Sequence, residues 1–512
     1  MIHLPTLRFD NPVAVRELRM RMRGGRAHLV MFAYVLVLSL VVFLGYLLSF
    51  NSSGPGGVQR MSPNLGKDLF TAMFGFQVAL IGLVTPGLTA WLISAEHEQQ
   101  TVELLLSSLL TSRNIVAGKL LPAIMFLLLL LLSSLPLATF CLVFGGLTPL
   151  KVLSGYVGLA FYGYVLACAG ILSSSLFKKS FAATIVAYMF AGAYTFIALT
   201  AFGSFYVSSR YAGGSLGHAG GVWGGLGIFP SFFVGFLEDR ELYAQIFGIN
   251  VPIALVMAIA SFLLGLLLVT MATANIPHFR EDRAPKVRLV FTAYSAFVVA
   301  VLVGSFAGTS SATTAVSREA VAVIMGALVA AAVTAAPQVA AAPLRDRDGS
   351  LASRLMHALL HPRQWLRTDG AGGFWFVLAW SGLMAFILYF GLTLAGANMT
   401  PVTEEMAWLF LVAIAMTAAS GAFGLMLYAL TGQVVMARAL GFLVTAVFWA
   451  VSSAIYTAIG SVYGEGLAVS AGGWIRYVWP FSPFNEWAHS SPPSSVRVFM
   501  SAVFSVGYAV AT

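Results

Sequence analysis

Long apolar runs without charge are the feature that most constrains this chain. The run from Ala27 to Phe50 has no ionisable residue after His28, and about 20 consecutive apolar residues are enough for a helix to cross a bilayer. Over the whole sequence 59% of residues are hydrophobic and 9% are charged, whereas an ordinary globular domain carries about 25% charged residues. We therefore predict a polytopic integral membrane protein without a soluble catalytic domain.

The first apolar run is compatible with a cleaved signal peptide or with a retained anchor. The apolar region of a signal peptide is about 7–15 residues long and is followed by a small-residue cleavage site. The run here is longer, and Leu48, Ser49, Phe50 and Asn51 make a poor cleavage site. The sequence favours a retained anchor.

The hydropathy pattern predicts about twelve membrane-spanning helices. Runs of this length leave little room for strands, so the predicted fold class is all-α. The predicted spans are residues 29–50, 69–93, 120–144, 152–177, 180–206, 250–275, 289–307, 319–341, 374–396, 406–430, 439–460 and 496–512.

The basic residues are distributed as a membrane topology signal. Lys and Arg favour cytoplasmic loops, and with a cytoplasmic N-terminus the inner segments hold 20 of the 28 Lys and Arg residues. Those segments are residues 1–28, 94–119, 178–179, 276–288, 342–373 and 431–438. The net charge of +9 is explained by this topology, with contacts to membrane lipid headgroups, and nucleic-acid binding is the weaker interpretation.

The spans suggest an organisation in two halves. Residues 1–28 form an N-terminal amphipathic segment, residues 29–275 a first six-helix region, and residues 276–512 a second one with a cytoplasmic insertion at 342–373. An aromatic–proline patch before the last span of each half hints at two diverged six-helix units. The alternative is that apolar membrane sequences simply resemble one another.

Basic residues recur at helical spacing just before the first span. A basic amphipathic helix of this kind lies in the lipid headgroup layer, and the alternative is a plain positively charged anchor. The residues that would share its basic face are Arg16, Arg19, Arg23 and Arg26.

The segment between the second and third spans predicts a short helix with one apolar stripe. Its stripe consists of Val102, Leu105, Leu106 and Leu109, at helical spacing, and Thr101 can cap its start. An exposed apolar stripe needs a surface to cover it. That surface is either the membrane or a partner protein.

The same segment resembles the cytoplasmic signature of ABC-2-type transporter permeases. The resemblance rests on Ile93-Ser94-x-Glu96-x-Glu98-x-x-Thr101, then Leu104-Leu105-Leu106, then Ile115-Val116-x-Gly118-Lys119. The opening Asn11-Pro12-Val13 with Arg16-Glu17-Leu18, and the run Lys178-Lys179-Ser180-Phe181-Ala182-Ala183-Thr184, resemble two further parts of that family. Together they cover roughly residues 10–275.

The resemblance implies how such a chain would be driven. In these permeases the loop transmits ATP-driven motion from a separate cytoplasmic ATPase subunit, which would bind the ATP. It makes residues 101–110 the coupling helix and Glu96, Glu98, Thr101, Gly118 and Lys119 the matching positions. It also implies a bacterial plasma membrane, and a second permease copy as a further partner. The family core has six spans and residues 276–512 roughly double it, so the chain acts either as one pseudo-dimer or as a homodimer.

Several kinds of site are absent from the sequence. No G-x-x-x-x-G-K-[ST] phosphate loop is present, and no ionisable relay residue lies deep in the predicted spans. His357 and His361 are four residues apart, as two zinc ligands would be, but no acidic or Cys ligand stands near them. We predict no catalytic residues and no metal.

The expected function is that of a permease subunit that moves an unidentified substrate with energy from a separate ATPase. Two alternatives remain at this stage: a membrane-embedded enzyme acting on lipid or peptide, and a structural membrane component. An enzyme would need a polar catalytic cluster, whereas the outward-facing acids, Glu238, Asp239, Glu404 and Glu405, are scattered over unrelated loops.

Overall fold

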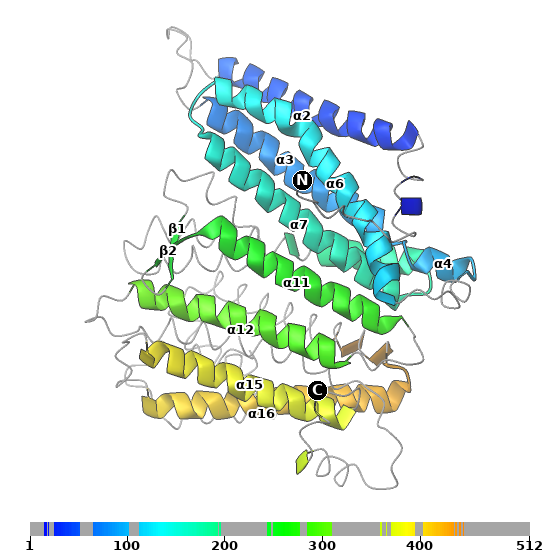
Figure 1. Cartoon of the computed structure of the whole chain (residues 1–512), viewed down its shortest axis with the longest axis vertical. Coiled ribbons are helices and arrows are strands. Elements are labelled where there is room, and N and C mark those ends of the chain that lie inside the picture. The colour runs from blue at the N-terminus through cyan, green and yellow to red at the C-terminus, as the bar shows by residue number, and fades with distance from the viewer. Residues whose placement is uncertain are drawn as a thin grey trace, which may run out of the picture. The chain divides into compact units, whose positions relative to one another are not determined.

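The computed structural model describes residues 15–17, 19, 25–51, 65–101, 112–192, 194–195, 243–246, 249–276, 284–309, 359–360, 365, 370–394, 403–434, 436–437, 440–441 and 444. These residues are helical almost throughout (Figure 1), which confirms the predicted all-α class. Two short strands, β1 (Tyr243–Ile246) and β2 (Ile249–Pro252), pair with each other. The chain divides into two compact units, residues 1–245 with 249–281, and residues 246–248 with 282–512.

The helices of the first unit follow the apolar runs closely. In a hydrocarbon environment every backbone polar group must be bonded within the segment, so such runs form helices. Pro149 begins one of them at the favoured first helical position, after an extended Thr148. The helices are α2 (Gly25–Asn51), α3 (Leu65–Thr89), α4 (Ser94–Glu98), α6 (Ser112–Val143), α7 (Pro149–Leu176), a further helix Ser180–Gly192, and α11 (Ile253–Asn275).

Helix α7 is the centre of this unit, because it packs against α3, α6 and α11. Glycines on α7 allow the close approach. A Cβ added at Gly170 would overlap Thr89 on α3, and one added at Gly163 would overlap Leu127 on α6. Small residues at helix interfaces are typical of membrane bundles, where association depends on van der Waals packing rather than on expulsion of water.

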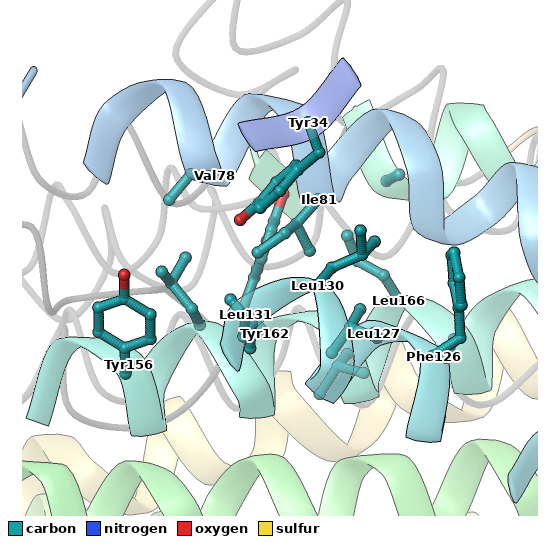
Figure 2. Close-up of a cluster of buried hydrophobic side chains, with 14 of the residues drawn as sticks. Tyr34, Val78, Ile81, Phe126, Leu127, Leu130, Leu131, Tyr156, Tyr162 and Leu166 are labelled. Atoms are coloured by element: carbon teal, nitrogen blue, oxygen red, sulfur yellow. The ribbon is translucent and has the colours of Figure 1, made fainter. Parts of the chain in front are cut away.

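The core of the first unit lies among α2, α3, α6 and α7 (Figure 2). It mixes leucines and isoleucines such as Ile81 and Leu127 with tyrosines such as Tyr156 and Tyr162, all of them buried. The outer surfaces of the same helices are also apolar: α2 exposes Phe32, among other large side chains. Apolar surface on both sides of a helix is what a lipid environment permits.

Within the described residues, six helices are long and apolar enough to cross a membrane. They are His28–Leu48, Leu65–Glu98, Ser112–Val143, Pro149–Leu176, Leu255–Asn275 and Gly372–Gly391. The predicted spans 319–341 and 496–512 lie outside the described residues, as do nearly all of 439–460 and the end of 180–206. The total of twelve therefore stays a prediction.

The second unit contains α12 (Ala284–Thr309), α15 (Gly370–Leu394) and α16 (Thr403–Thr431), with α15 packed against both of the others. The α12–α15 interface combines rings and polar groups. The Trp380 indole N–H donates to the Ser295 hydroxyl at 2.7 Å. Arg288 is buried, lies 5.3 Å from the Phe376 ring centroid, and donates to the Trp365 carbonyl.

The two cysteines are buried in the first unit. Cys141 lies on α6 and Cys168 on α7, and both are free thiols. They pack in the apolar core as small hydrophobic side chains.

Candidate functional site

The candidate site lies where α3 ends and α6 begins, at the base of the 102–111 segment (Figure 1). Helix α3 ends at Thr89, and a turn leads into the five-residue helix α4. Helix α4 ends in a bonded C-terminal turn: the Gln100 N–H donates to the His97 carbonyl at 3.2 Å, and the Thr101 N–H donates to the Glu96 carbonyl at 3.0 Å. This pair of bonds is the Schellman motif.

The Schellman turn places an unusual residue in the left-handed conformation. Gln100 has φ of 58°, at a position that glycine usually occupies because any Cβ there is strained. The strain is of order 1–2 kcal/mol for a non-glycine residue. The buried contacts on either side of the turn therefore stabilise α4 despite the unfavourable backbone conformation of Gln100.

Three of the sequence-predicted residues meet in a charged cluster at this base. The Lys119 Nζ lies 2.8 Å from Glu96 Oε1, and the Thr101 hydroxyl donates to the other oxygen of the same carboxylate. Lys119 comes from the first turns of α6, next to the buried Gly118, so its ion pair with Glu96 joins the two ends of the 102–111 segment. We call Glu17, Glu96, Thr101 and Lys119 the charged clamp.

The clamp also includes the segment before the first span. Glu17 Oε1 lies 3.7 Å from Lys119 Nζ, and Arg16 is close enough to attract Glu96. The side chains are 4% exposed for Lys119, 26% for Glu96 and 18% for Glu17. Removing one partner of a buried ion pair typically costs about 3–5 kcal/mol, because the other charge is left without compensation.

Two further contacts fasten α4 to the elements that follow. The Ser174 hydroxyl near the end of α7 accepts from the backbone N–H groups of Ile93, at 2.8 Å, and Ser94, at 3.0 Å. The Glu98 carboxylate accepts from the Ser180 N–H at 2.8 Å and from the Ser180 hydroxyl at 3.0 Å. The Ser174 bonds are buried, whereas the Glu98 bonds are exposed.

The remaining sequence-predicted residues are distributed differently. Arg16 and Arg19 are helical and exposed, whereas the side chains of Arg23 and Arg26 are outside the described part of the structure. The predicted coupling helix is also outside it, with the apolar stripe Val102, Leu105, Leu106 and Leu109. Among the described residues no three His, Cys, Asp or Glu side chains come together as metal ligands.

Sequence reasoning missed three residues of this site: Glu17, Ser174 and Ser180. Glu17 and Ser180 both stand inside stretches that carried the family resemblance, so their importance could have been suspected. Their partners could not, because a loop residue's charge or hydroxyl does not indicate which distant element it will contact. Ser174 has no signal at all, since it lies in the run Ser173-Ser174-Ser175 at the end of an apolar helix.

A second polar centre lies inside the bundle, and sequence reasoning overlooked it by considering only ionisable residues. Gln77 is fully buried on α3, and its amide N–H groups donate to the Ser134 hydroxyl at 2.7 Å and the Tyr156 hydroxyl at 3.3 Å. The hydroxyl oxygens of Ser134 and Tyr156 lie 3.0 Å apart. Tyr34 adds a buried hydroxyl from α2, which makes no hydrogen bond within the described residues. We call these four residues the neutral cluster.

The apolar helices are those of a multi-pass membrane protein, and the clamp joins the residues on either side of the 102–111 segment. Residues 12–209 match the family model described as ABC-2 family transporter protein. This part of the chain is an ABC-2 family transporter membrane domain. The match confirms the family resemblance. A search of curated proteins found no match for this chain.

Proposed function

We propose that the chain is the permease subunit of an ATP-driven transporter, powered by a separate cytoplasmic ATPase that docks on the 94–119 loop. It moves an as yet unidentified substrate across the plasma membrane of a bacterium. The single observation that supports this most strongly is the Glu96–Lys119 ion pair of 2.8 Å at the base of the loop. A loop closed at its base transmits a displacement of its tip to both helices that carry it.

The clamp connects the loop to the bundle in a way that suits such a role. Glu96 follows α3, Lys119 belongs to α6, and Glu17 precedes α2. Parting the pair would leave a buried charge uncompensated. A push on the 102–111 segment would therefore displace the ends of several helices together rather than bend the loop alone.

Charge and motif patterns support the rest of the proposal. The excess of Lys and Arg in segments 1–28, 94–119 and 342–373 favours a cytoplasmic N-terminus and loop. The sequence has no phosphate loop of its own. Within this proposal, Arg16, Arg19, Arg23 and Arg26 face lipid headgroups or the ATPase, and the chain works with a second permease copy or as a pseudo-dimer.

Docking is tested by a substitution in the predicted apolar stripe. Leu105→Asp places a charge among residues that the proposal buries against the ATPase, and a fully buried Leu contributes roughly 1.5–3 kcal/mol. We expect recovery of the ATPase in a pull-down to fall about tenfold or more, since each 1.4 kcal/mol is tenfold. Leu104→Asp is the matched control, because the helical period sets Leu104 opposite the stripe. Equal recovery by wild type and Leu105→Asp would contradict the docking proposal.

A further inference from the structure

The helix Ser180–Gly192 is attached to the α3–α4 region at two points. At its first residue, Ser180 donates twice to the Glu98 carboxylate, at 2.8 and 3.0 Å. Eight residues later, the Tyr188 hydroxyl donates to the Leu83 carbonyl on α3 at 2.8 Å. At about 1.5 Å per residue, these attachments are roughly 12 Å apart along the helix.

The Tyr188 attachment is built closely into α3. A Cβ added at Gly87 would lie 2.8 Å from the Tyr188 hydroxyl, so the glycine makes room for it. Pro86 stands beside it in the interior of α3, where it interrupts the regular helical hydrogen bonding. Tyr188 and its bond are exposed on the surface of the unit. Tyr188 lies within an apolar helix, however, so lipid would surround it, and lipid cannot replace a lost bond to a carbonyl as water can. The Tyr188–Leu83 bond is therefore harder to break than the Ser180–Glu98 bonds.

The Glu98 attachment is of the opposite kind. Glu98 is exposed and Ser180 is half-buried, and both bonds between them are exposed, so water can solvate the two partners when they separate. The other bonds of the loop base do not share this property: Ser174 holds the backbone of Ile93 and Ser94 in a buried contact, and Lys119 is 4% exposed. Helix α4 is thus held firmly to α6 and α7, and only weakly to the start of the next helix.

We propose that Glu98 is a positioning residue, which latches the first turn of the helix Ser180–Gly192 to the loop and releases it during the transport cycle. When the latch opens, this helix pivots about its Tyr188–Leu83 bond while α4 moves together with α6 and α7. The inference rests on the proposed function for its driving force, the ATPase. The latch itself is a property of this chain alone.

The latch is tested by amide hydrogen exchange on the full chain in lipid nanodiscs. Glu98→Ala should speed exchange of amides 180–184 roughly fivefold, the factor that corresponds to loss of a helix cap of about 1 kcal/mol. Glu98→Gln keeps an acceptor oxygen and should restore most of the protection. Exchange of the Ile93 and Ser94 amides should not change in Glu98→Ala. The control variant Asp68→Ala, which removes an exposed acid at the other end of α3, should leave exchange of all these amides unchanged.

A second measurement separates the latch from ATPase docking. In the complex with the ATPase, a non-hydrolysable ATP analogue should speed exchange of amides 180–184 in wild type and leave Glu98→Ala unchanged. Unchanged exchange in the isolated Glu98→Ala chain would overturn the latch. A failure of the docking proposal itself would appear with Leu105→Asp, and would not affect exchange in the isolated chain.

Discussion

The charged clamp and the neutral cluster both connect helices of the first unit, but they do so with different chemistry. Each joins several helices of the first unit through polar side chains, and each contains one residue from α6, Lys119 in the clamp and Ser134 in the cluster. The clamp uses a Lys–Glu pair at the helix ends, whereas the cluster uses an amide and hydroxyls. A charge at the bilayer centre costs at least about 2.5–3.5 kcal/mol, so ion pairs belong near the surface and neutral hydrogen bonds inside.

The comparison also shows how strongly each centre fixes its helices. A charge that loses its partner in a buried site has no good alternative, whereas a buried amide can exchange among several hydroxyls. Hydrogen bonds between membrane helices average about 0.6 kcal/mol and reach about 1.7 kcal/mol. The clamp should therefore hold its helices more rigidly. Substitutions in the clamp should also destabilise the chain more than substitutions in the neutral cluster.

The largest effect is expected from Lys119→Met. The change leaves Glu96 and Glu17 facing each other without the cation, and we expect a loss of about 3 kcal/mol, the low end for a buried pair because Glu96 is 26% exposed. Thermal unfolding of the purified chain in nanodiscs should shift down by roughly 5–10 °C.

The matched control for the clamp removes both charges. The double variant Lys119→Met/Glu96→Gln should recover more than half of the lost stability, since replacing a whole buried pair is far less harmful than breaking it. Equal losses in the single and double variants would mean that Lys119 stabilises through packing rather than charge.

A smaller effect is expected from Gln77→Leu in the neutral cluster. It removes the donors to Ser134 and Tyr156 and should cost about 1–2 kcal/mol, measured by the same unfolding experiment. Tyr34→Phe is the control, because its buried hydroxyl makes no hydrogen bond within the described residues and its removal should leave stability unchanged or raise it. A loss for Gln77→Leu as large as that for Lys119→Met would remove the distinction between the two centres.

The smallest effect, and the only gain, is expected from Gln100→Gly. Glycine relieves the left-handed strain of about 1–2 kcal/mol but adds about 0.5–1 kcal/mol of unfolded-state entropy. A net stabilisation of roughly 0.5–1 kcal/mol should follow, visible as a small rise in the unfolding temperature. Gln99→Gly, one residue earlier with a right-handed backbone, should destabilise instead. A loss in both variants would show that Gln100 contributes a side-chain contact that outweighs its strain.

The sequence predicted the helices well and their packing poorly, for a physical reason. Length and hydropathy locate a helix such as α6 or α7, because lipid forces any long apolar run to satisfy its own backbone. The inward face is harder to find, since in lipid both faces are apolar: Phe32 faces outward from α2 and Leu38 faces inward. A soluble helix has a polar outer face and an apolar inner face. That difference, which would identify the inward side, is missing here.

The site was predicted in part for a related reason. Glu96, Thr101 and Lys119 were identified from a family resemblance, which carries positions but no geometry, and the structure brings them together. Gln77 could have been found by asking which uncharged polar side chains lie in the middle of an apolar run. Its partners, Ser134 and Tyr156, are 57 and 79 residues away, and no local pattern connects them.

The buried positions of Cys141 and Cys168 make this chain convenient for chemical labelling. Thiol reagents act on thiolates that they can reach from water, and both natural thiols are enclosed by the packed cores of α6 and α7. The natural thiols of the unmodified chain should therefore give little background labelling. A single cysteine introduced in a segment predicted to be cytoplasmic, at Ser107 or Ser353 for example, would carry a fluorophore, a spin label or an impermeant tag without first removing the natural ones.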